Sequence, residues 1–439
     1  MIIETSLFTV FLHVVIKNIM KDLEFVNNWL EQTPNHTCFR VNQLKDFDIN
    51  KLKNVLVSQS NELKTTQIPD YFFLKPDCLI VNQWSVNFAI EKGKHEVIVD
   101  APCGAAVLRG SNVFAPGVLG LPSNCKLDEL VDIYSDLCGK CKRGLKTEYM
   151  GNKKYVGTGY LKKLRCNLFD EGIQPSGIAV QTLLPASKLV VVNETWFPSG
   201  QVVLQNLPSI VCGWVMDAQP TEYILDMCAA PGNKTTHLAE MSDNRAFITA
   251  IDRTDKKVEM IKENCRIQNV SCVNAYKYDS RKCYSETDNK NEGPPYPSNY
   301  FDKVLLDAPC SGLGQRPRLV NNMSPKMLQS YKFVQRKLLE AAVKVLKVDG
   351  KLVYSTCTVT EDENEGLVKW AIDNFPCLQL IPAEPLCGGP GLPNCGLSDS
   401  ERSMVQRFGP EEDPLRLVDS IYRNSIGFFI AAFKKVGEM

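Results

Sequence analysis

The stretch EYILDMCAAPGNKTTHLAEM (residues 222–241) decides the fold. It passes from an apolar run of strand length, through a turn of small residues, into a segment with helical spacing. The same alternation continues in AFITAID (246–252), KKVEMIKENCRIQ (256–268), SCVNAYKYD (271–279), FDKVLLD (301–307), PKMLQSYKFVQRKLLEAAVKVLK (325–347) and GKLVYST (350–356). Strands that alternate with helices are typical of a parallel sheet covered on both faces. Residues 193–439 are therefore predicted to form an α/β, Rossmann-like domain.

Two further regions are predicted upstream of this domain. Residues 1–95 mix the strand-like runs TCFRVN (37–42) and DCLIVN (77–82) with an amphipathic segment at 49–64, which indicates a small α+β region. Residues 96–192 hold short apolar runs, separated by turns rich in glycine and proline, that we interpret as strands: HEVIVD (95–100), AAVLRG (105–110) and KLVVVN (188–193). This pattern favours a compact β-barrel or sandwich.

Bulk composition limits the function classes. The chain of 439 residues has 50 basic and 50 acidic residues, so any binding of nucleic acid must depend on a local basic patch. Its 17 cysteines lack the close, regular spacing of a disulfide framework, and we expect free thiols in the cytoplasm. The apolar start (1–16) has Glu4 before its apolar run and no small-residue cleavage site, so a secretory signal or membrane anchor is not favoured.

A basic segment lies within the predicted barrel. Between Gly139 and Arg165, nine basic residues and the single acid Glu148 give a local charge of +8. A run of charge is often only a solvated face, but aromatic residues that can stack on bases are interleaved here: Tyr149, Tyr155 and Tyr160. The combination favours nucleic-acid binding.

Aspartates close successive strands of the predicted α/β sheet. Asp226, Asp252 and Asp307 end their strands, and Asp279 follows another. Ligands of open α/β sheets bind outside the carboxyl ends of the strands, and an acid about 20 residues after a glycine turn suits a ribose diol. Asp252 lies 20 residues after Gly232. The patterns of a phosphate-binding P-loop and of a dinucleotide turn are absent, so an adenosyl ligand without pyrophosphate fits better than a dinucleotide. The alternative is that these aspartates only cap helices, but four of them at successive strand ends favour a ligand site.

Two cysteines also follow neighbouring predicted strands. Cys310 stands in Asp307-Ala-Pro-Cys-Ser-Gly and Cys357 in Ser355-Thr-Cys-Thr, next to the proposed ligand edge. Most thiols are small buried hydrophobes, but one that adds to carbon 6 of cytosine makes carbon 5 nucleophilic. A carboxyl group at the ring nitrogen and a group that removes the carbon 5 proton complete such a site. The one CxxC pair, Cys138–Cys141, lacks a second pair at zinc-site spacing, so we expect no metal.

Four motifs together resemble the Nop/Sun family of RNA cytosine-5 methyltransferases. They are QNLPS (205–209), DMCAAPGNKT (226–235), DAPCSGLG (307–314) and STCTVTEDENE (355–365). APCGAAVLRGSNVFAPGV (101–118), SDLCGKCKRG (135–144), CSGLGQRP (310–317) and SIGFFIAAF (425–433) look like a family member that carries a PUA domain. The resemblance covers residues 37–435. It implies a methyltransferase domain at 193–439 preceded by an RNA-binding PUA domain at 96–192.

The resemblance also implies residue roles. Cys357 would be the nucleophile, Cys310 would assist proton removal and release, Asp307 would bind the ring nitrogen, and Lys234 would orient Asp307. S-adenosylmethionine would contact Cys228, Ala229, Ala230, Pro231, Gly232, Asn233, Lys234, Asp252, Asp279 and Asp307. RNA would contact Arg109, Phe114, Lys140, Lys142 and Arg143. The implied substrate is transfer RNA near its 3′ CCA acceptor end, or messenger RNA with a similar motif, and we expect a monomer.

Three positions depart from the family pattern. Asn233 replaces the second glycine of PGGKT, Phe114 replaces a tyrosine, and Thr221 replaces a glycine. Because asparagine tolerates left-handed backbone better than most residues, we expect Asn233 to weaken cofactor binding without abolishing it. Two alternatives stay open: an RNA-binding protein with a degenerate cofactor site, and a DNA cytosine methylase, whose Pro-Cys nucleophile would correspond to Cys310.

Overall fold

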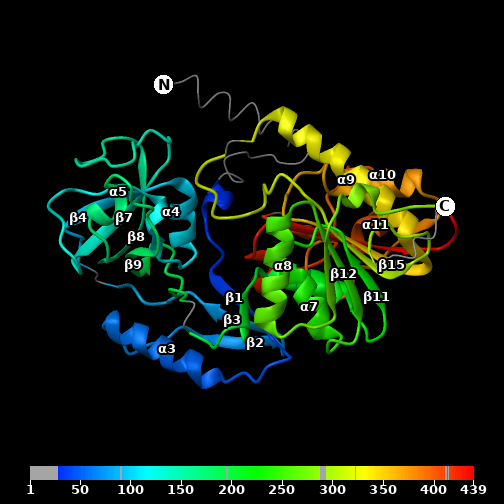
Figure 1. Ribbon diagram of the computed structural model, residues 1–439, viewed down its shortest axis with the longest axis horizontal. Coiled ribbons are helices and arrows are strands. Elements are labelled where there is room, and N and C mark those ends of the chain that lie inside the picture. Colours follow the sequence, from blue (N-terminus) through cyan, green and yellow to red (C-terminus); the bar gives the residue numbers. More distant parts are fainter. Residues whose placement is uncertain are drawn as a thin grey trace.

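The computed structural model describes residues 28–88, 91–193, 196–286, 293–321, 323–410, 413 and 415–439. The apolar start of the chain lies outside them. Figure 1 shows a β-rich domain on the left and an α/β domain on the right, with a small sheet and its helix α3 below and between them. Within the described ranges, no helix combines the length and apolarity that crossing a membrane requires.

The α/β domain is built on an eight-stranded sheet with the order β13-β12-β11-β14-β15-β18-β16, and β17 pairs with β18. Its strands are β11 (Tyr223–Asp226), β12 (Phe247–Asp252), β13 (Val273–Lys277), β14 (Phe301–Asp307), β15 (Leu346–Thr356), β16 (Leu378–Ile381), β17 (Gln406–Phe408) and β18 (Phe428–Lys435). Strands β11 to β15 run parallel, whereas β18 is antiparallel to β15. The predicted strand and helix alternation is confirmed.

Helices cover both faces of this sheet. Leu225 packs in one core cluster with residues of α9 and α10, whereas its neighbour Ile224 packs in another with residues of α6 and α7. Side chains alternate along a strand, so the sheet is apolar on both faces. The helices are α6 (Leu207–Met216), α7 (Asn233–Met241), α8 (Asp255–Gln268), α9 (Pro325–Val345), α10 (Glu365–Asn374), α11 (Asp399–Met404) and α12 (Ser420–Arg423), with the short 3₁₀ turn η2 (Ser280–Lys282).

The small sheet has the order β10-β1-β3-β2. It consists of β1 (His36–Val41), β2 (Tyr71–Lys75), β3 (Cys78–Asn82) and β10 (Val202–Leu204), with α3 (Ile49–Glu62) between β1 and β2 in the chain. Strand β10 comes after the whole β-rich region, yet it pairs with β1. The chain therefore leaves this sheet after β3 and returns to it at β10. The domain boundaries at 95 and 192 stay a prediction.

The β-rich domain is a six-stranded sheet of order β5-β9-β8-β7-β4-β6, and no pairing of β5 with β6 closes it in the described chain. Its elements are β4 (His95–Val99), α4 (Ala101–Leu108), β5 (Val113–Phe114), the 3₁₀ turn η1 (Ala115–Gly117), β6 (Val118–Gly120), β7 (Leu130–Asp136), β8 (Lys153–Leu161), α5 (Cys166–Phe169) and β9 (Ile178–Pro185).

Two runs that we interpreted as strands in this region are not strands. Residues 105–108 lie in helix α4, because Asp100 caps the helix by accepting a hydrogen bond from the Cys103 amide and Pro102 occupies its first turn. Residues 188–193 form no regular element, although Val190 is fully buried. Both segments are apolar because they are buried, and this apolarity led us to interpret them as strands.

A buried arginine joins the small sheet to the α/β domain. Arg40, on β1, donates hydrogen bonds to the Asn233 carbonyl at the start of α7 and to the side chains of Thr236 and Glu240 within it, the latter two at 2.8 and 2.9 Å. Its side chain is completely buried. The hydrogen bonds from its terminal nitrogens offset the cost of burying the charge, so this contact fixes the start of α7 relative to β1.

Candidate active site

The turn between β11 and α7 positions one wall of the site. Gly232 has a φ of +109°, and a Cβ placed there would lie 3.3 Å from the Cα of Ile261. Asn233 is the first residue of α7 and is not among the residues with positive φ. The left-handed conformation belongs to Gly232, and the helix begins one residue later, so tolerance of that conformation is not what Asn233 supplies. Its effect on cofactor binding stays a prediction.

A cavity of about 190 Å³ lies where this turn meets the carboxyl ends of the strands. The predicted residues Cys228, Ala230, Asp252, Asp279 and Asp307 line it. The lining also includes residues that the sequence analysis did not single out: Met227, Arg253, Lys257, Ser280, Arg281, Ala308, Pro309, Val334 and Leu338. The strand-end acids thus gather at one cavity, as the parallel sheet requires.

The acids at this cavity differ in their partners. Asp252 accepts from the Ala230 amide at 3.1 Å and pairs with Lys257 at 3.0 Å. The Asp279 carboxylate is bridged by Arg281, and this hydrogen bonding is the main cause that lowers the pKa of Asp279. Asp226 is completely buried behind the cavity, and burial raises its pKa to about 7.

Lys234 and Asp307 form an ion pair with an Nζ–Oδ2 distance of 2.7 Å. Burial acts to lower the pKa of Lys234, but the neighbouring Asp307 outweighs it and the pKa is raised overall. The other Asp307 oxygen accepts from the Ser355 hydroxyl at 2.7 Å. Both carboxylate oxygens are thus held, and the side chain keeps about a third of its surface (31%) exposed toward the site.

The two predicted cysteines face one another. Cys310 Sγ and Cys357 Sγ are 3.4 Å apart, just past the ends of the neighbouring parallel strands β14 and β15. The hydrogen bond from Cys310 lowers the pKa of Cys357 and raises that of Cys310. Gln315, which the sequence analysis missed, donates a second hydrogen bond to Cys357 Sγ at 3.4 Å. Of the two cysteines, Cys357 is the one whose pKa is lowered.

A buried acid supports Cys310 from behind. Glu363 is 1% exposed and accepts hydrogen bonds from both the amide and the hydroxyl of Ser311, at 2.9 and 2.6 Å. It also accepts from Gln335 at 3.0 Å and from Thr360 at 2.8 Å. Ser311 and Glu363 lie inside the two cysteine motifs, and this placement was the only sequence signal for them.

The cysteines open into a cleft of about 710 Å³ that both large domains line. The β-rich domain contributes Asp100, Ala101, Pro102, Ala105, Arg109, Leu119, Asp136 and Gly139. The α/β domain contributes Ala308, Pro309, Cys310, Gly312, Gln315, Pro317, Arg318, Leu319, Val320 and Cys357. A substrate that lies on the β-rich domain thus has direct access to the two thiols.

The basic segment is less free than its sequence suggests. Lys153, Lys154 and Lys162 pair with acids from elsewhere in the chain, namely Glu96, Glu31 and Asp128. Tyr149 is buried and donates its hydroxyl to Asp136, so our interpretation of it as a stacking residue is wrong. Tyr155 keeps 41% of its surface exposed.

The predicted RNA-contacting residues lie on the exposed surface of this domain. Lys140, Lys142 and Arg143 are exposed on the loop between β7 and β8. Asp136 holds that loop by accepting from the amides of Cys138 and Cys141. Arg109 and Phe114 are exposed and border a second cavity, described below.

Comparison with known proteins agrees with this geometry. The model of the 16S rRNA methyltransferase RsmB/F family matches residues 214–392. The chain is 40% identical to the mouse tRNA (cytosine(72)-C(5))-methyltransferase NSUN6, over 82% of this chain and 78% of that protein. It is 39% identical to human NSUN6, over 92% and 90%.

The chain belongs to the RNA cytosine-5 methyltransferase family. Among solved structures, this methyltransferase is similar to NSun6 from Pyrococcus horikoshii with SFG, an analogue of S-adenosylmethionine. The TM-score is 0.72 at 28% identity, with 98% of each chain covered. The predicted Rossmann-like fold of the methyltransferase and its family are thus confirmed.

Proposed function

We propose that this methyltransferase transfers a methyl group from S-adenosylmethionine to carbon 5 of a cytosine near the 3′ end of transfer RNA. The observation that carries the proposal is the pair of facing thiols at the bottom of a cleft whose opposite wall is the β-rich domain. One wall supplies the covalent chemistry, and the other supplies a surface for RNA. The relatives named for cytosine 72 of transfer RNA support the choice of substrate.

The Cys357 thiolate begins the reaction. Its sulfur adds to carbon 6 of the cytosine, and the electron pair of the 5,6 double bond moves to carbon 5. The addition pushes negative charge onto ring nitrogen 3, and a proton held between this nitrogen and the Asp307 carboxylate neutralises it, while Lys234 and Ser355 hold that carboxylate in place. The pKa difference between the two thiols supports Cys357 as the nucleophile and argues against the arrangement of DNA cytosine methylases.

Release of the product needs the second thiol. Once carbon 5 carries the methyl group, its proton must leave and the bond from sulfur to carbon 6 must break. Cys310, whose sulfur lies 3.4 Å from that of Cys357, first passes its own proton to solvent, and its thiolate then accepts the carbon 5 proton directly or through a water molecule. The Cys357 thiolate leaves as the 5,6 double bond forms again.

The cavity beside Asp252 and Cys228 fits S-adenosylmethionine. Cys228 and Ala230 line it, and the turn of small residues to which they belong (228–232) lets an adenosyl group approach the backbone closely. Oδ1 of Asp252 is occupied by the Arg253 amide and Lys257, whereas Oδ2 accepts only from the Ala230 amide and keeps a lone pair for a ribose hydroxyl. Asp307 lines this cavity as well. When bound, the cofactor supplies a methyl group on a positively charged sulfur.

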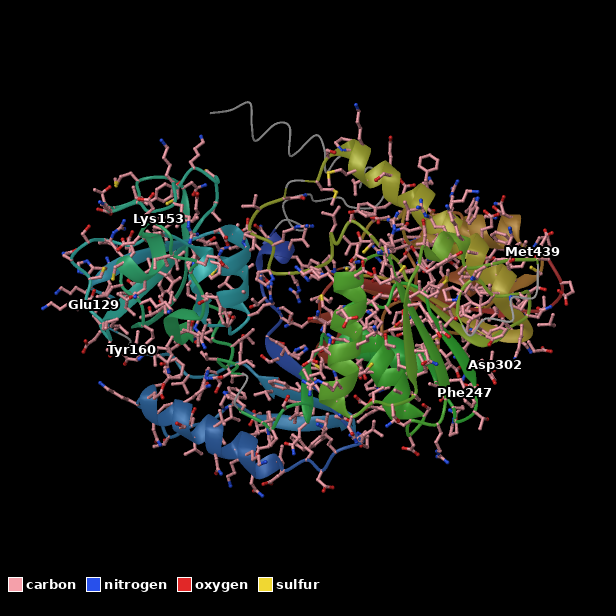
Figure 2. The ribbon with its side chains drawn as sticks, viewed as in Figure 1. Glu129, Lys153, Tyr160, Phe247, Asp302 and Met439 are labelled. Carbon is pink, nitrogen blue, oxygen red and sulfur yellow. The ribbon has the colours of Figure 1, made fainter. Side chains whose placement is uncertain are left out.

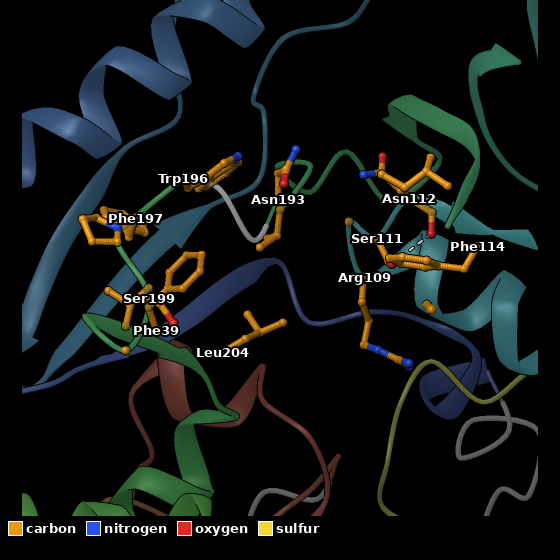
Figure 3. A pocket seen from close by; sticks show the side chains of 17 residues that line it. Phe39, Arg109, Ser111, Asn112, Phe114, Asn193, Trp196, Phe197, Ser199 and Leu204 are labelled. Carbon is orange, nitrogen blue, oxygen red and sulfur yellow. Dashed lines mark hydrogen bonds between the residues drawn. The ribbon is translucent and has the colours of Figure 1, made fainter. Parts of the chain in front are cut away.

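We further propose that the β-rich domain is a PUA domain that holds the RNA end. A second cavity of about 680 Å³ lies between it and the small sheet, with Phe114 on one side and Trp196 and Phe197 on the other (Figure 3). Phe114 keeps 44% of its surface exposed and can stack on an unpaired base, whereas Trp196 and Phe197 are largely buried and form the apolar wall of the cavity. Arg109 borders both this cavity and the cleft with the thiols, so it lies on the path between them.

Three basic residues of the β7–β8 loop complete this RNA surface. Lys140 and Lys142 are exposed and suit phosphate contacts. Arg143 donates to the carbonyls of Pro116 and Val118, so we assign it the positioning of the loop in addition to RNA contact. Cytoplasmic location, a monomeric state and messenger RNA as a substrate stay predictions.

The test is methyl transfer from labelled S-adenosylmethionine to a transcript of transfer RNA that has cytosine 72 and a CCA end. We expect one methyl group per RNA, mapped to cytosine 72 by bisulfite sequencing. Replacement of cytosine 72 by uracil should abolish transfer, and removal of CCA should weaken it. Cys357→Ala should be inactive, with Cys272→Ala as the matched control thiol.

An RNA-binding protein without activity is the competing function. Calorimetry with S-adenosylmethionine separates the two, because a degenerate cofactor site would give no binding even at millimolar ligand. Binding of RNA without any methyl transfer by the wild-type protein would refute the proposed function.

A further inference from the structure

Three potential metal ligands converge in the β-rich domain, away from the active site. His95 begins β4, Glu129 directly precedes β7, and Cys125 lies in the loop between β6 and β7. One imidazole nitrogen, one carboxylate oxygen and the thiol sulfur all lie within 4.8 Å of one another. Figure 2 shows Glu129 at the outer edge of this domain, on the side opposite to the α/β domain.

Two atoms of this cluster are buried without a partner. Among the described residues, neither His95 Nε2 nor Glu129 Oε1 has a hydrogen-bond partner, although both atoms are shielded from solvent. They are 3.9 Å apart, which is too far for a hydrogen bond. The two side chains keep only 14% and 12% of their surface exposed. Buried polar atoms are nearly always paired, so an orphaned nitrogen and an orphaned oxygen that face each other point to a missing partner between them.

We propose that His95, Cys125 and Glu129 bind a zinc ion. Nitrogen, sulfur and oxygen donors are the set that zinc takes, and three protein ligands leave a fourth position for water. Ligand atoms around a tetrahedral zinc lie roughly 3.3–3.6 Å apart, given bond lengths of about 2.0–2.3 Å. The observed spacing of 3.9–4.8 Å therefore needs the side chains to close by about an ångström.

A bound cation would change which charge states of these side chains are favoured. The Cys125 thiol already hydrogen-bonds the Glu129 carboxylate. A divalent cation favours the thiolate and neutralises the carboxylate. Arg165 is engaged elsewhere, because its guanidinium donates to the carbonyls of Leu121, Gly144 and Leu145.

The ion would fasten the loop between β6 and β7 to the start of β4. His95 and Val131 are partners in the parallel ladder of β4 and β7, so the site lies at the end of that ladder. Arg165 ties Leu121, in the same loop, to Gly144 in the middle of the β7–β8 loop, which carries Lys140 and Lys142. The zinc would thus stabilise the RNA-binding surface without taking part in methyl transfer.

The metal content of the full-length protein tests the proposal. The purified chain, free of any affinity tag, is loaded with zinc, dialysed and analysed by mass spectrometry of the metal, and a parallel sample is loaded with cobalt. We expect one zinc per chain and a thiolate-to-cobalt charge-transfer band. Cys125→Ser should lose the band and the zinc, and Glu129→Gln, which leaves every thiol in place, should lose most of the zinc.

Cys166→Ser is the matched control, because Cys166 is an exposed thiol of the same domain. It should keep both the zinc and the cobalt band. Should Cys125→Ser fail to fold, Glu129→Gln decides the question alone. A wild-type protein that binds no zinc overturns the proposal, and so does equal zinc content in the wild type and in Glu129→Gln, since the metal would then lie at other thiols.

Discussion

Replacement of Cys310 by alanine removes the donor that contributes most to lowering the pKa of the Cys357 thiol. Without that donor the pKa of Cys357 rises, so less thiolate is present at neutral pH. A hydrogen bond to a charged group contributes about 1.5–3 kcal/mol. Because about 1.4 kcal/mol corresponds to a factor of ten, bond formation at carbon 6 should slow by roughly 10- to 100-fold at pH 7.

The assay is single-turnover formation of the covalent complex on RNA with 5-fluorocytosine at the target position, followed on denaturing gels across a pH series. In this RNA the proton that Cys310 would accept is replaced by fluorine, so the step assigned to Cys310 in release does not enter. The rates of Cys310→Ala and the wild type should converge as the pH rises, because both proteins then carry the thiolate.

Two matched variants define the effect further. Gln315→Met removes the second donor to Cys357 and should slow the reaction less than Cys310→Ala. Cys272→Ala removes a half-buried thiol that directly precedes β13, at the opposite end of the sheet, and should change nothing. Equal rates for Cys310→Ala and the wild type at every pH would show that Cys310 does not stabilise the thiolate. Mapping of the wild-type adduct to Cys310 would refute the assignment of the nucleophile.

Three further predictions concern charge and backbone. Lys234→Met leaves Asp307 without its cation, so kcat/KM should fall about 100-fold; an unchanged kcat/KM would show that the ion pair is not needed. Thr221, a β-branched residue on the surface, has a φ of +70°, and Thr221→Gly should raise the free energy of unfolding in urea by about 1 kcal/mol, whereas a loss of stability would contradict the strain. Burial raises the pKa of Asp226 to about 7, so the folded state holds a proton that the unfolded state releases near pH 4. The protonated Asp226 therefore contributes fully to the free energy of unfolding below about pH 4, and this contribution is lost as the pH rises through about 7. Asp226→Asn should reduce the loss of unfolding free energy between pH 5 and 8. Parallel pH profiles of the unfolding free energy in the variant and the wild type would contradict this.

The α/β domain was predictable because its signals are local. Each strand is an apolar run that ends in an acid or near a cysteine, and parallel strands bring their carboxyl ends to one edge. Asp252 and Asp307 therefore line one cavity, and Cys310 and Cys357 line the neighbouring cleft, with Ala308 and Pro309 common to both. The partners Ser355 and Gln315 lie inside the same motifs, but nothing in their spacing shows which sulfur or oxygen they face.

Errors arose where a specific side-chain contact, rather than periodicity, decides the structure. The run at 105–110 is apolar because α4 packs inside the β-rich domain, and only the cap at Asp100 distinguishes it from a strand. Tyr149 is buried and donates its hydroxyl to Asp136, a contact that no periodicity reveals. The cluster of His95, Cys125 and Glu129 has no motif spacing, because the parallel pairing of β4 with β7 creates it.

The return of the chain to the small sheet at β10 determines how the β-rich domain can be exchanged or removed. Strands β3 and β10 both pair with β1, so the β-rich domain is an insertion whose two ends are attached to the same small sheet. Because the β-rich domain is attached to the small sheet at both of its ends, its rotation relative to that sheet is restricted. A different RNA-binding module grafted between residues 83 and 201 would inherit this orientation over the cleft. A fragment that starts after residue 201 would lack Arg40, and with it the anchor of the cofactor turn.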